Sequence, residues 1–395
     1  MDARLITPVV VGAGPVGAVC ALALAQQGIP PRVIEALPAD ARSDSRTLAL
    51  SHGAQLILDR LGVWDRLDGV TPITRIHISQ RGAFGVTRLS AAEVGVPALG
   101  YVLSYATLSA ALKQALHDAA VEVDYGVAVE RIDPDADAAT VHTAQGSLTA
   151  PLVVVADGGR AADAPRPRLK HDYAHKAIVC EVRTELPHAQ QAYERFTPDG
   201  PAALLPLPDP PGAYDLSRTK VRERSYALVW TAANAAAERI AALDDGAFLD
   251  ALYQHFGGRQ GRFLSASPRK SFPLTLAYTD SVASARVVRI GNAAQTLHPV
   301  AGQGFNIGLR DAWELASLCG DHPEALGSPA QLAAYARGRR ADVIGGLGFT
   351  DFLVRLFSND IPPLRHARGL GLFALEALPS LKTFVARRMM FGSHG

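Results

Sequence analysis

The stretch Val9-Val10-Val11-Gly12-Ala13-Gly14-Pro15-Val16-Gly17 decides the fold, because a β-rich hydrophobic run leads into spaced glycines and then an Ala/Leu-rich sequence. Gly12 permits the tight turn, Gly14 lets the backbone approach a pyrophosphate, and Gly17 allows a helix to pack closely on the strand. The same strand, turn and helix account for the uncharged run Leu5–Pro31 without a signal peptide or a membrane span. A soluble α/β protein is therefore predicted.

The sequence beyond this stretch completes a βαβ unit. A helix is expected from Pro15 to Gln27, with Gly28 as its cap, and a strand from Arg32 to Glu35. A pyrophosphate would meet the N–H groups at the helix start. Glu35 would accept a hydrogen bond from a ribose 2′-hydroxyl, and its charge disfavours NADP. The motif leaves FAD and NAD open, and the structural alternative is a glycine turn in another α/β protein.

Farther along, α/β sequence is interrupted twice by antiparallel-type sequence. We predict a discontinuous Rossmann-like domain interleaved with an antiparallel-sheet domain and followed by a helical C-terminal region, an α/β (α+β overall) fold. The expected limits are 1–71, 100–174 and 271–325 for the Rossmann-like domain, 72–99 and 175–270 for the antiparallel sheet, and 326–395 for the helical region.

The bulk composition excludes several classes of function. Lys and Arg number 39 and Asp and Glu 38, so the chain has no net field for nucleic acid. The cysteines Cys20, Cys180 and Cys319 are far apart, without metal-ligand spacing, and favour a reducing cytoplasm. Motifs for nucleophilic or metal catalysis, such as HExxH or GxSxG, are absent. A cofactor must therefore carry the chemistry, and no metal is expected.

The second motif runs from Gly291-Asn292 through His298-Pro299 to Asp311. It resembles the second FAD-binding motif of the aromatic-hydroxylase flavoproteins, specifically the ubiquinone-biosynthesis hydroxylases, whose pattern is GNAAxxxHPxAGQGxNxGxxD. Within that family, the branch of 2-octaprenyl-6-methoxyphenol hydroxylases is the most similar. The resemblance covers nearly the whole chain and continues in 44–51, 156–158, 194–201 and 205–206.

This resemblance implies that both motifs bind FAD. Gly302, Gly304 and Gly308 would let the backbone lie near the flavin ring, and the helix starting near Asn306 would offer N–H dipoles to its pyrimidine edge. Asn292 would accept from a ribityl hydroxyl. The expected cofactor-binding residues are Gly12, Gly14, Pro15, Gly17, Glu35, Arg46, Asp157, Gly291, Asn292, Pro299, Gly302, Gln303, Gly304, Phe305 and Asn306.

Some positions have two interpretations or depart from the family. His298 and Pro299 either close a loop or form a wall over the flavin, and we favour positioning over acid–base catalysis. Asp157 serves FAD or closes a turn. The Ser that usually follows the Asp-Gly element is absent, and Tyr105 stands where relatives often have Arg or Asn. A second GxGxxG is also absent, so NAD(P)H binds transiently or a partner delivers the electrons.

The family's chemistry implies a monooxygenase that uses a flavin C4a-hydroperoxide, formed with dioxygen, to hydroxylate a polyprenyl methoxyphenol. The protein would exclude water and hold the ring. The alternatives are another phenolic substrate, or a non-catalytic flavoprotein in a complex of ubiquinone-biosynthesis enzymes. The expected substrate-lining residues, for which ordinary sheet core is the alternative, are Phe196, Leu205, Pro206 and Leu207.

The C-terminal region shows apolar residues at helical spacing. Phe349, Leu356 and Phe357 belong to one such face, and Leu370 and Phe373 to a second. Pro379 is expected to end the helix, with Lys382, Arg387 and Arg388 following. The segment could rest on the inner face of the membrane or on a partner enzyme, or simply pack on the cofactor domain.

Overall fold

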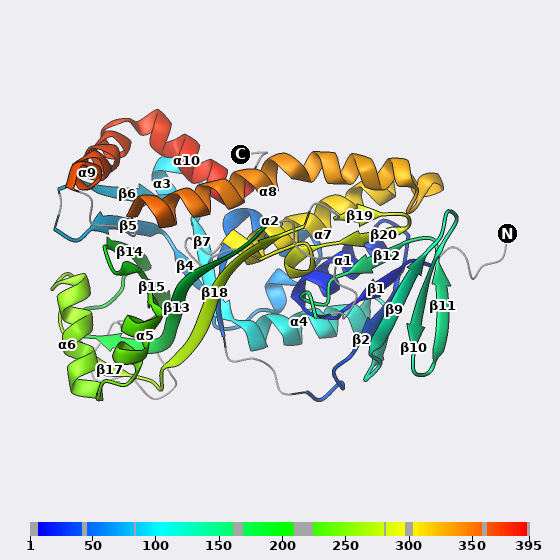
Figure 1. Cartoon of the computed structure of the whole chain (residues 1–395), viewed down its shortest axis with the longest axis horizontal. Coiled ribbons are helices and arrows are strands. Elements are labelled where there is room, and N and C mark those ends of the chain that lie inside the picture. Colours follow the sequence, from blue (N-terminus) through cyan, green and yellow to red (C-terminus); the bar gives the residue numbers. More distant parts are fainter. Residues whose placement is uncertain are drawn as a thin grey trace.

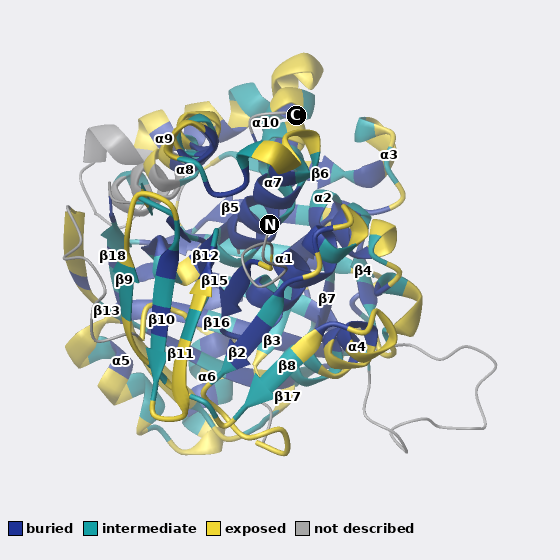
Figure 2. Cartoon of the chain, turned by 90° about the vertical axis from the view of Figure 1, so that its right-hand side faces the viewer, coloured by how far each residue is buried: buried dark blue, intermediate teal, exposed yellow. Residues whose placement is uncertain are grey.

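The computed structural model describes residues 7–41, 46–82, 84–160, 169–208, 224–279, 282–296, 303–357 and 362–392, except for the side chains of 347, 349–355, 357 and 362–365. Figure 1 shows a smaller parallel sheet toward the N-terminal end of the long axis, a larger twisted sheet toward the other end, and helix α8 running along both. Buried residues gather in the middle of the molecule, and exposed ones lie on outer helices and loop ends (Figure 2).

The predicted βαβ opening is confirmed. Among the described residues, six strands form a sheet in the order β19-β20-β12-β1-β2-β8, of which only β19 runs antiparallel to its neighbour. Its strands are rich in valine because both faces are covered. Their bounds are β1 Val9–Val11, β2 Arg32–Glu35, β8 Glu122–Tyr125, β12 Val153–Val155, β19 Ala283–Ser284 and β20 Val287–Arg289.

Helices cover one face of this sheet and a small antiparallel sheet covers the other. The helices are α1 Pro15–Gln26, α2 His52–Arg60, α4 Tyr105–Asp118 and α7 Gln303–Asp321, with the short η2 Trp64–Arg66, η3 Gly291–Ala293 and η5 Pro323–Ala325 nearby. Leu24, Leu108 and Leu309 belong to the core between them and the sheet. The covering sheet, which was not among the predicted elements, consists of β9 Val129–Pro134, β10 Ala139–Thr143 and β11 Gly146–Ala150.

The predicted antiparallel sheet is present and larger than expected. Its order in the described residues is β21-β18-β13-β16-β15-β14-β5-β6, with β17 added beside β13; only β14 and β5 pair in parallel. The bounds are β5 Arg75–Gln80, β6 Val86–Ser90, β13 Leu169–Thr184, β14 Gln191–Thr197, β15 Gly200–Leu207, β16 Ser225–Ala233, β17 Phe263–Ala266, β18 Lys270–Tyr278 and β21 Gln295–Thr296. Helices α5 Asn234–Ala241 and α6 Asp245–Phe256 pack on it.

A second small antiparallel sheet joins the two halves. It contains β3 Thr47–Ser51, β4 Thr71–Ile73 and β7 Gly100–Ser104, followed by α2 and α4; α3 Ala91–Val94 lies nearby. Ile73 and Val102 of this sheet pack against Ala192 and Ala227 of the large one. The interleaving of sequence segments is thus visible, while the exact domain limits stay a prediction, since β18 pairs in the large sheet although 271–325 was assigned to the cofactor domain.

The C-terminal region is helical, with α8 Pro329–Phe357, α9 Pro362–Ala377 and α10 Pro379–Phe391. Pro379 starts a new helix after α9 has ended, as a proline at the first helical position does. Lys382 does not extend a basic face: its Nζ lies 2.9 Å from Glu93 Oε2 and 3.5 Å from Glu376 Oε2. No single described helix is long and apolar enough to cross a membrane; His366–Ala377 and Pro379–Phe391 qualify only as a pair bent by 98°.

Candidate active site

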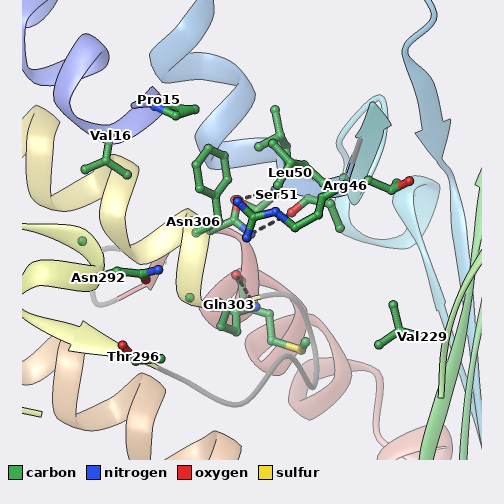
Figure 3. A pocket seen from close by; sticks show the side chains of 18 of the residues that line it. Pro15, Val16, Arg46, Leu50, Ser51, Val229, Asn292, Thr296, Gln303 and Asn306 are labelled. Atoms are coloured by element: carbon green, nitrogen blue, oxygen red, sulfur yellow. Dashed lines mark hydrogen bonds between the residues drawn. The ribbon is translucent and has the colours of Figure 1, made fainter. Parts of the chain in front are cut away.

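A cavity of about 1260 Å³ lies between the two large sheets. One end is lined by β1, the start of α1, β3 and the start of α7, and the other by β5, β14, β15, α9 and α10. Figure 3 shows Asn292 and Thr296 on one side and Val229 of the large sheet across from them. The volume exceeds the roughly 300–1,000 Å³ of common small-molecule pockets, so the cavity can hold a dinucleotide and a second molecule together.

The first glycine turn has the geometry that its sequence predicts. Gly12 has φ +103°, and a Cβ there would lie 2.6 Å from the Ala156 carbonyl oxygen. A Cβ on Gly17 would lie 1.9 Å from the Gly12 carbonyl oxygen. A Cβ on Gly14 would meet only the Tyr105 hydroxyl, 3.9 Å away. Gly12 and Gly17 therefore serve packing, whereas the space beside Gly14 belongs to the cavity.

Glu35 is fixed at the end of β2, on the cavity wall. Its Oε2 accepts from the Ala13 N–H at 2.6 Å and its Oε1 from the Leu37 N–H at 2.8 Å. Backbone donors therefore hold the carboxylate beside the glycine turn. The remaining lone pairs can accept from a ligand hydroxyl.

The start of α7 supplies the second motif's share of the wall. Gln303, Gly304, Phe305 and Asn306 all line the cavity, and the N–H groups of a first helical turn have no partner within the helix. The Asn306 side chain is used elsewhere: its Oδ1 accepts from Ser51 N–H at 2.8 Å and its Nδ2 donates to the Ala49 carbonyl at 3.1 Å. Asn306 thus joins α7 to β3, and the first turn of the helix lines the cavity.

Gly308 was expected to let the backbone lie near the flavin ring, but it does not line the cavity. A Cβ there would lie 3.0 Å from Val16 Cγ2 and 3.2 Å from Gly291 Cα. The glycine is required because α7, α1 and the Gly291 turn meet at this point. Gly304 does line the cavity, in the first turn of the helix.

Asp311, the last residue of the motif, is a structural anchor. Its Oδ2 accepts from the Gly291 N–H at 3.1 Å and from Gln295 Nε2 at 2.7 Å, which holds the 291–295 turn against α7. Its Oδ1 accepts from Arg339 Nε at 2.8 Å. The carboxylate is buried, and Arg339 of α8 supplies its counter-charge.

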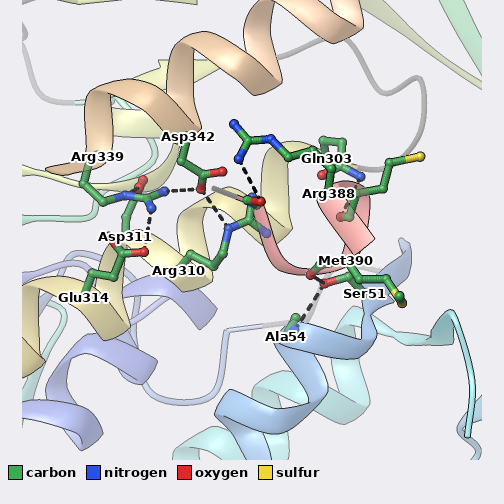
Figure 4. A network of polar contacts seen from close by, with 12 residues as sticks. Ser51, Ala54, Gln303, Arg310, Asp311, Glu314, Arg339, Asp342, Arg388 and Met390 are labelled. Atoms are coloured by element: carbon green, nitrogen blue, oxygen red, sulfur yellow. Dashed lines mark hydrogen bonds and ion pairs between the residues drawn. The ribbon is translucent and has the colours of Figure 1, made fainter. Parts of the chain in front are cut away.

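Arg339 belongs to a larger buried network (Figure 4). It also contacts Glu314 at 2.8 Å and Asp342 at 2.9 Å, and Asp342 in turn accepts from Arg310 Nε at 2.8 Å. Burial works against the charge of Asp342, but Arg310 and Arg339 outweigh it and hold the pKa of Asp342 below its ordinary value. Arg339 and Asp342 were not predicted from the sequence, because no local pattern links α8 to the motif.

The other predicted cofactor residues are brought together at the same end. The Arg46 guanidinium lies over the Tyr105 ring, 5.2 Å from its centroid, and both border the cavity. Asp157 Oδ1 accepts from the Gly159 N–H at 2.9 Å, which closes the turn after β12. Gly17 lies behind the wall. The predicted residues that line the cavity are Gly12, Gly14, Pro15, Glu35, Arg46, Asp157, Gly291, Asn292, Gln303, Gly304, Phe305 and Asn306.

Three predicted residues lie outside the described part of the chain. They are His298, Pro299 and Gly302, in the segment 297–302 between β21 and α7. The positioning role of His298 and Pro299 stays a prediction.

Two of the four predicted substrate-lining residues border the cavity, and their contact with a substrate stays a prediction. Phe196 and Leu205 line the cavity, but Pro206 and Leu207 do not. Successive side chains of a strand point to opposite faces of the sheet, so Pro206 points away from the face that carries Leu205. Pro206 is paired with Tyr226 of β16. Leu207 shares the face of Leu205 but lies past the cavity, packed against Ile73 and Val102.

Much of this apolar end was missed. Helices α9 and α10 contribute to its wall, and Leu372 packs against Phe196. Glu194 of β14 also lines the cavity, and burial raises the pKa of Glu194 to about 8. The residues contributed by the two helices are Ala367, Arg368, Gly371, Leu372, Leu375, Leu381, Val385, Ala386, Met389 and Met390.

Comparisons with known proteins agree with this geometry. A model of the FAD binding domain family matches residues 6–344. The chain is 36% identical to ubiquinone hydroxylase UbiL of Rhodospirillum rubrum, over 96% of this chain and 88% of that protein. It is 32% identical to 3-demethoxyubiquinol 3-hydroxylase of Escherichia coli, over 94% and 95%. The p-nitrophenol 4-monooxygenase PnpA of Pseudomonas putida superposes with a TM-score of 0.73 at 18% identity, over 98% of each chain.

Proposed function

The chain belongs to the FAD-dependent hydroxylases of ubiquinone biosynthesis, and from this premise we propose that it hydroxylates the ring of a polyprenyl methoxyphenol. The observation that supports this substrate class is the continuous cavity, which joins a glycine-rich end suited to a dinucleotide to an end walled by apolar side chains. A ring held between the two ends would meet the cofactor, and its prenyl tail would lie among the apolar residues. Dioxygen is the source of the added oxygen atom.

The residues at the glycine-rich end fit FAD. Gly14 leaves open space where a pyrophosphate would approach, Glu35 keeps lone pairs for a ribose hydroxyl, and the first turn of α7 offers N–H groups. Arg46 and Asn292 complete the wall. When bound and reduced, FAD activates dioxygen and supplies the electrons for its reduction. The protein's part is to hold the substrate's phenol ring next to the flavin ring and to exclude water.

NAD(P)H is the proposed electron donor. A transient encounter suffices, because the first glycine turn is already committed to FAD and the sequence has no second GxGxxG.

The cavity's apolar end is continuous with an exposed apolar surface. Leu381 of α10 borders the cavity and is 42% exposed. Leu370 and Phe373 of α9 and Phe384 of α10 are more than half exposed on the same pair of helices. Such side chains favour an apolar environment. This α9–α10 surface rests on the membrane that carries the prenylated substrate and lets the tail pass into the cavity.

The catalytic proposal is tested with the purified full chain. We expect a yellow protein that holds FAD and oxidises NADH or NADPH faster when a short-chain prenylated methoxyphenol is added, with one atom of labelled dioxygen in the product. A colourless protein that does not take up FAD contradicts the proposal. Bound FAD without substrate-stimulated oxidation favours a non-catalytic flavoprotein instead. The quinone precursor that accumulates on gene deletion identifies the ring position.

The membrane contact is tested by flotation with phosphatidylcholine vesicles, with and without phosphatidylglycerol. The double variant Phe373→Ser, Phe384→Ser should lower the bound fraction by about tenfold or more, since each exposed Phe contributes roughly 1.5–3 kcal/mol when buried in an apolar phase. Leu264→Ser is the matched control, because Leu264 is 46% exposed on β17, outside this surface. Equal flotation of all three proteins refutes the contact.

A further inference from the structure

A carboxyl group, that of Glu194, lies on the apolar wall of the cavity, away from the residues proposed to bind FAD. Glu194 lies on β14, where Ala192, Glu194 and Phe196 face the cavity at alternate positions. In register with Glu194 across the sheet are Ile78 of β5 and Ala203 of β15. Both of these partners also line the cavity. The carboxyl group therefore has apolar neighbours on either side.

No described residue gives the Glu194 side chain a hydrogen bond or an ion pair. Arg368 of α9 also borders the cavity, but its Nη1 donates to the Leu356 carbonyl at 2.9 Å. His77 of β5 packs against the Tyr193 ring. The other titratable or charged side chains that border the cavity are Tyr193, and, at the cofactor end, Glu35, Arg46, Tyr105, Asp157 and Arg160.

An isolated carboxyl group in an apolar wall is costly unless a ligand uses it. Burial is the cause that raises the pKa of Glu194 to about 8. A carboxylate with a raised pKa is a stronger base and better matched to a phenol, whose pKa is near 10 by analogy with tyrosine. The chemistry of the proposed substrate supplies one matching group, the ring hydroxyl.

Resting on the proposed function, we infer that Glu194 is a catalytic residue, whose carboxylate accepts the hydrogen bond and then the proton of the substrate's phenolic hydroxyl. The proton moves to Oε of Glu194 while a ring carbon forms its bond to oxygen. It returns to the phenolic oxygen when that ring carbon releases its hydrogen as a proton and the ring becomes aromatic again. The oxidant is dioxygen: its O–O bond breaks as one atom bonds to the ring carbon and becomes the new hydroxyl group, and the other atom leaves as water. Reduced FAD would supply the two electrons and two protons, and the proton released by the ring carbon completes the water molecule.

Only the ionised carboxylate of Glu194 can accept a proton, so kcat/KM should depend on pH. Glu194 is protonated below about pH 8 and ionised above it. The kcat/KM of the wild type should therefore rise with pH through this value and then level off. The rise of kcat/KM with pH should be absent in Glu194→Gln. Above pH 8 the kcat/KM of this variant should be about 100-fold lower than that of the wild type, within the range of general base catalysis.

The experiment compares the FAD-loaded wild type with Glu194→Gln, Glu194→Asp and the control Glu181→Gln. Glu181 is exposed on β13, outside the cavity. Binding of a short-chain prenylated methoxyphenol and of its O-methyl ether is measured by calorimetry. Above pH 8 the wild type and Glu181→Gln should prefer the phenol by about 10- to 100-fold, the equivalent of a hydrogen bond to a charged group. Glu194→Gln should lose most of this preference, and Glu194→Asp should keep part of it and the rise of kcat/KM with pH.

The outcomes separate the two proposals. If Glu194→Gln keeps both the phenol preference and the rise of kcat/KM with pH, the role of Glu194 is refuted while the proposed function stands. If the wild type holds FAD but hydroxylates no prenylated phenol, the proposed function fails. The ratio of phenol to ether affinity then still decides whether Glu194 binds a phenolic hydroxyl. FAD content and the unfolding temperature confirm that each variant is folded.

Discussion

The two ends of the cavity are built in different ways. At the cofactor end the wall is largely backbone: a glycine turn after β1, the first turn of α7 and the turn at Gly291. At the apolar end the wall is made of side chains from β5, β14 and β15 and from two helices near the end of the chain. Backbone walls require particular residues, above all glycine, at fixed spacing. Side-chain walls require only apolar character and the right volume.

This contrast explains why the cofactor is easier to identify than the substrate. Gly12 and Gly17 have contacts that no other residue allows, so their spacing is a constraint on the sequence. Phe196 and Leu205 could exchange for other apolar residues without disturbing the fold.

Arg339→Met tests whether the cofactor end depends on its buried ion network. We expect a loss of about 3–5 kcal/mol in the free energy of unfolding, because Asp311 and Asp342 would lose a buried counter-charge. The measurement is urea denaturation together with FAD content, since Asp311 also holds the Gly291 turn. The control is Arg337→Met, at an exposed position of the same helix. Unchanged stability would show that the network is dispensable.

Gly14→Ala tests the backbone wall itself. The new Cβ meets no protein atom closer than 3.9 Å, so the fold should keep its stability. The methyl group would occupy cavity space and weaken FAD binding by about 10- to 100-fold, the equivalent of an overpacking cost of about 1–3 kcal/mol. FAD titration of the apoprotein measures the effect. Gly338→Ala, which adds a Cβ without contacts on α8, should leave the affinity unchanged.

Phe196→Leu tests the side-chain wall. It should raise the KM for a prenylated phenol by about tenfold, the lower end of the effect of a missing apolar group in a pocket, and leave FAD affinity unchanged. Steady-state kinetics with a saturating electron donor measures it. Phe263→Leu, at a buried core position outside the cavity, is the control and should change only stability. Equal KM values in the two variants would show that the phenyl ring of Phe196 does not contact the substrate.

Pro206→Ala should have the smallest effect. Because Pro206 lies on the face of β15 away from the cavity, we expect KM and FAD affinity to stay within about twofold of the wild type. A KM change as large as that of Phe196→Leu would mean that the strand register is different. The same kinetic assay decides the matter.

Local constraints were predictable from the sequence, whereas long-range ones were not. The strand Arg32–Glu35 and the start of α1 follow from periodicity and from the residues that begin and end helices. The partner of Asp311 lies 28 residues away on α8, and no motif connects the two. Pro206 was placed in the wrong wall because apolar character alone does not tell the two faces of a buried strand apart. Glu194 stood in a quoted motif, yet its surroundings depend on which strands flank β14 and on the position of α9.

Helix α10 connects residues distant in the sequence. The Met390 carbonyl accepts from Ser51 Oγ at 3.0 Å, and the Met389 carbonyl from Gln303 Nε2 at 3.4 Å. Met389 and Met390 also border the cavity. During synthesis on a ribosome, the glycine turn emerges hundreds of residues before this helix. Because the cofactor wall also needs the Gly291 turn and α7, the nascent polypeptide can complete this wall only after α7 has emerged, and it can close the cavity only after α10 has emerged.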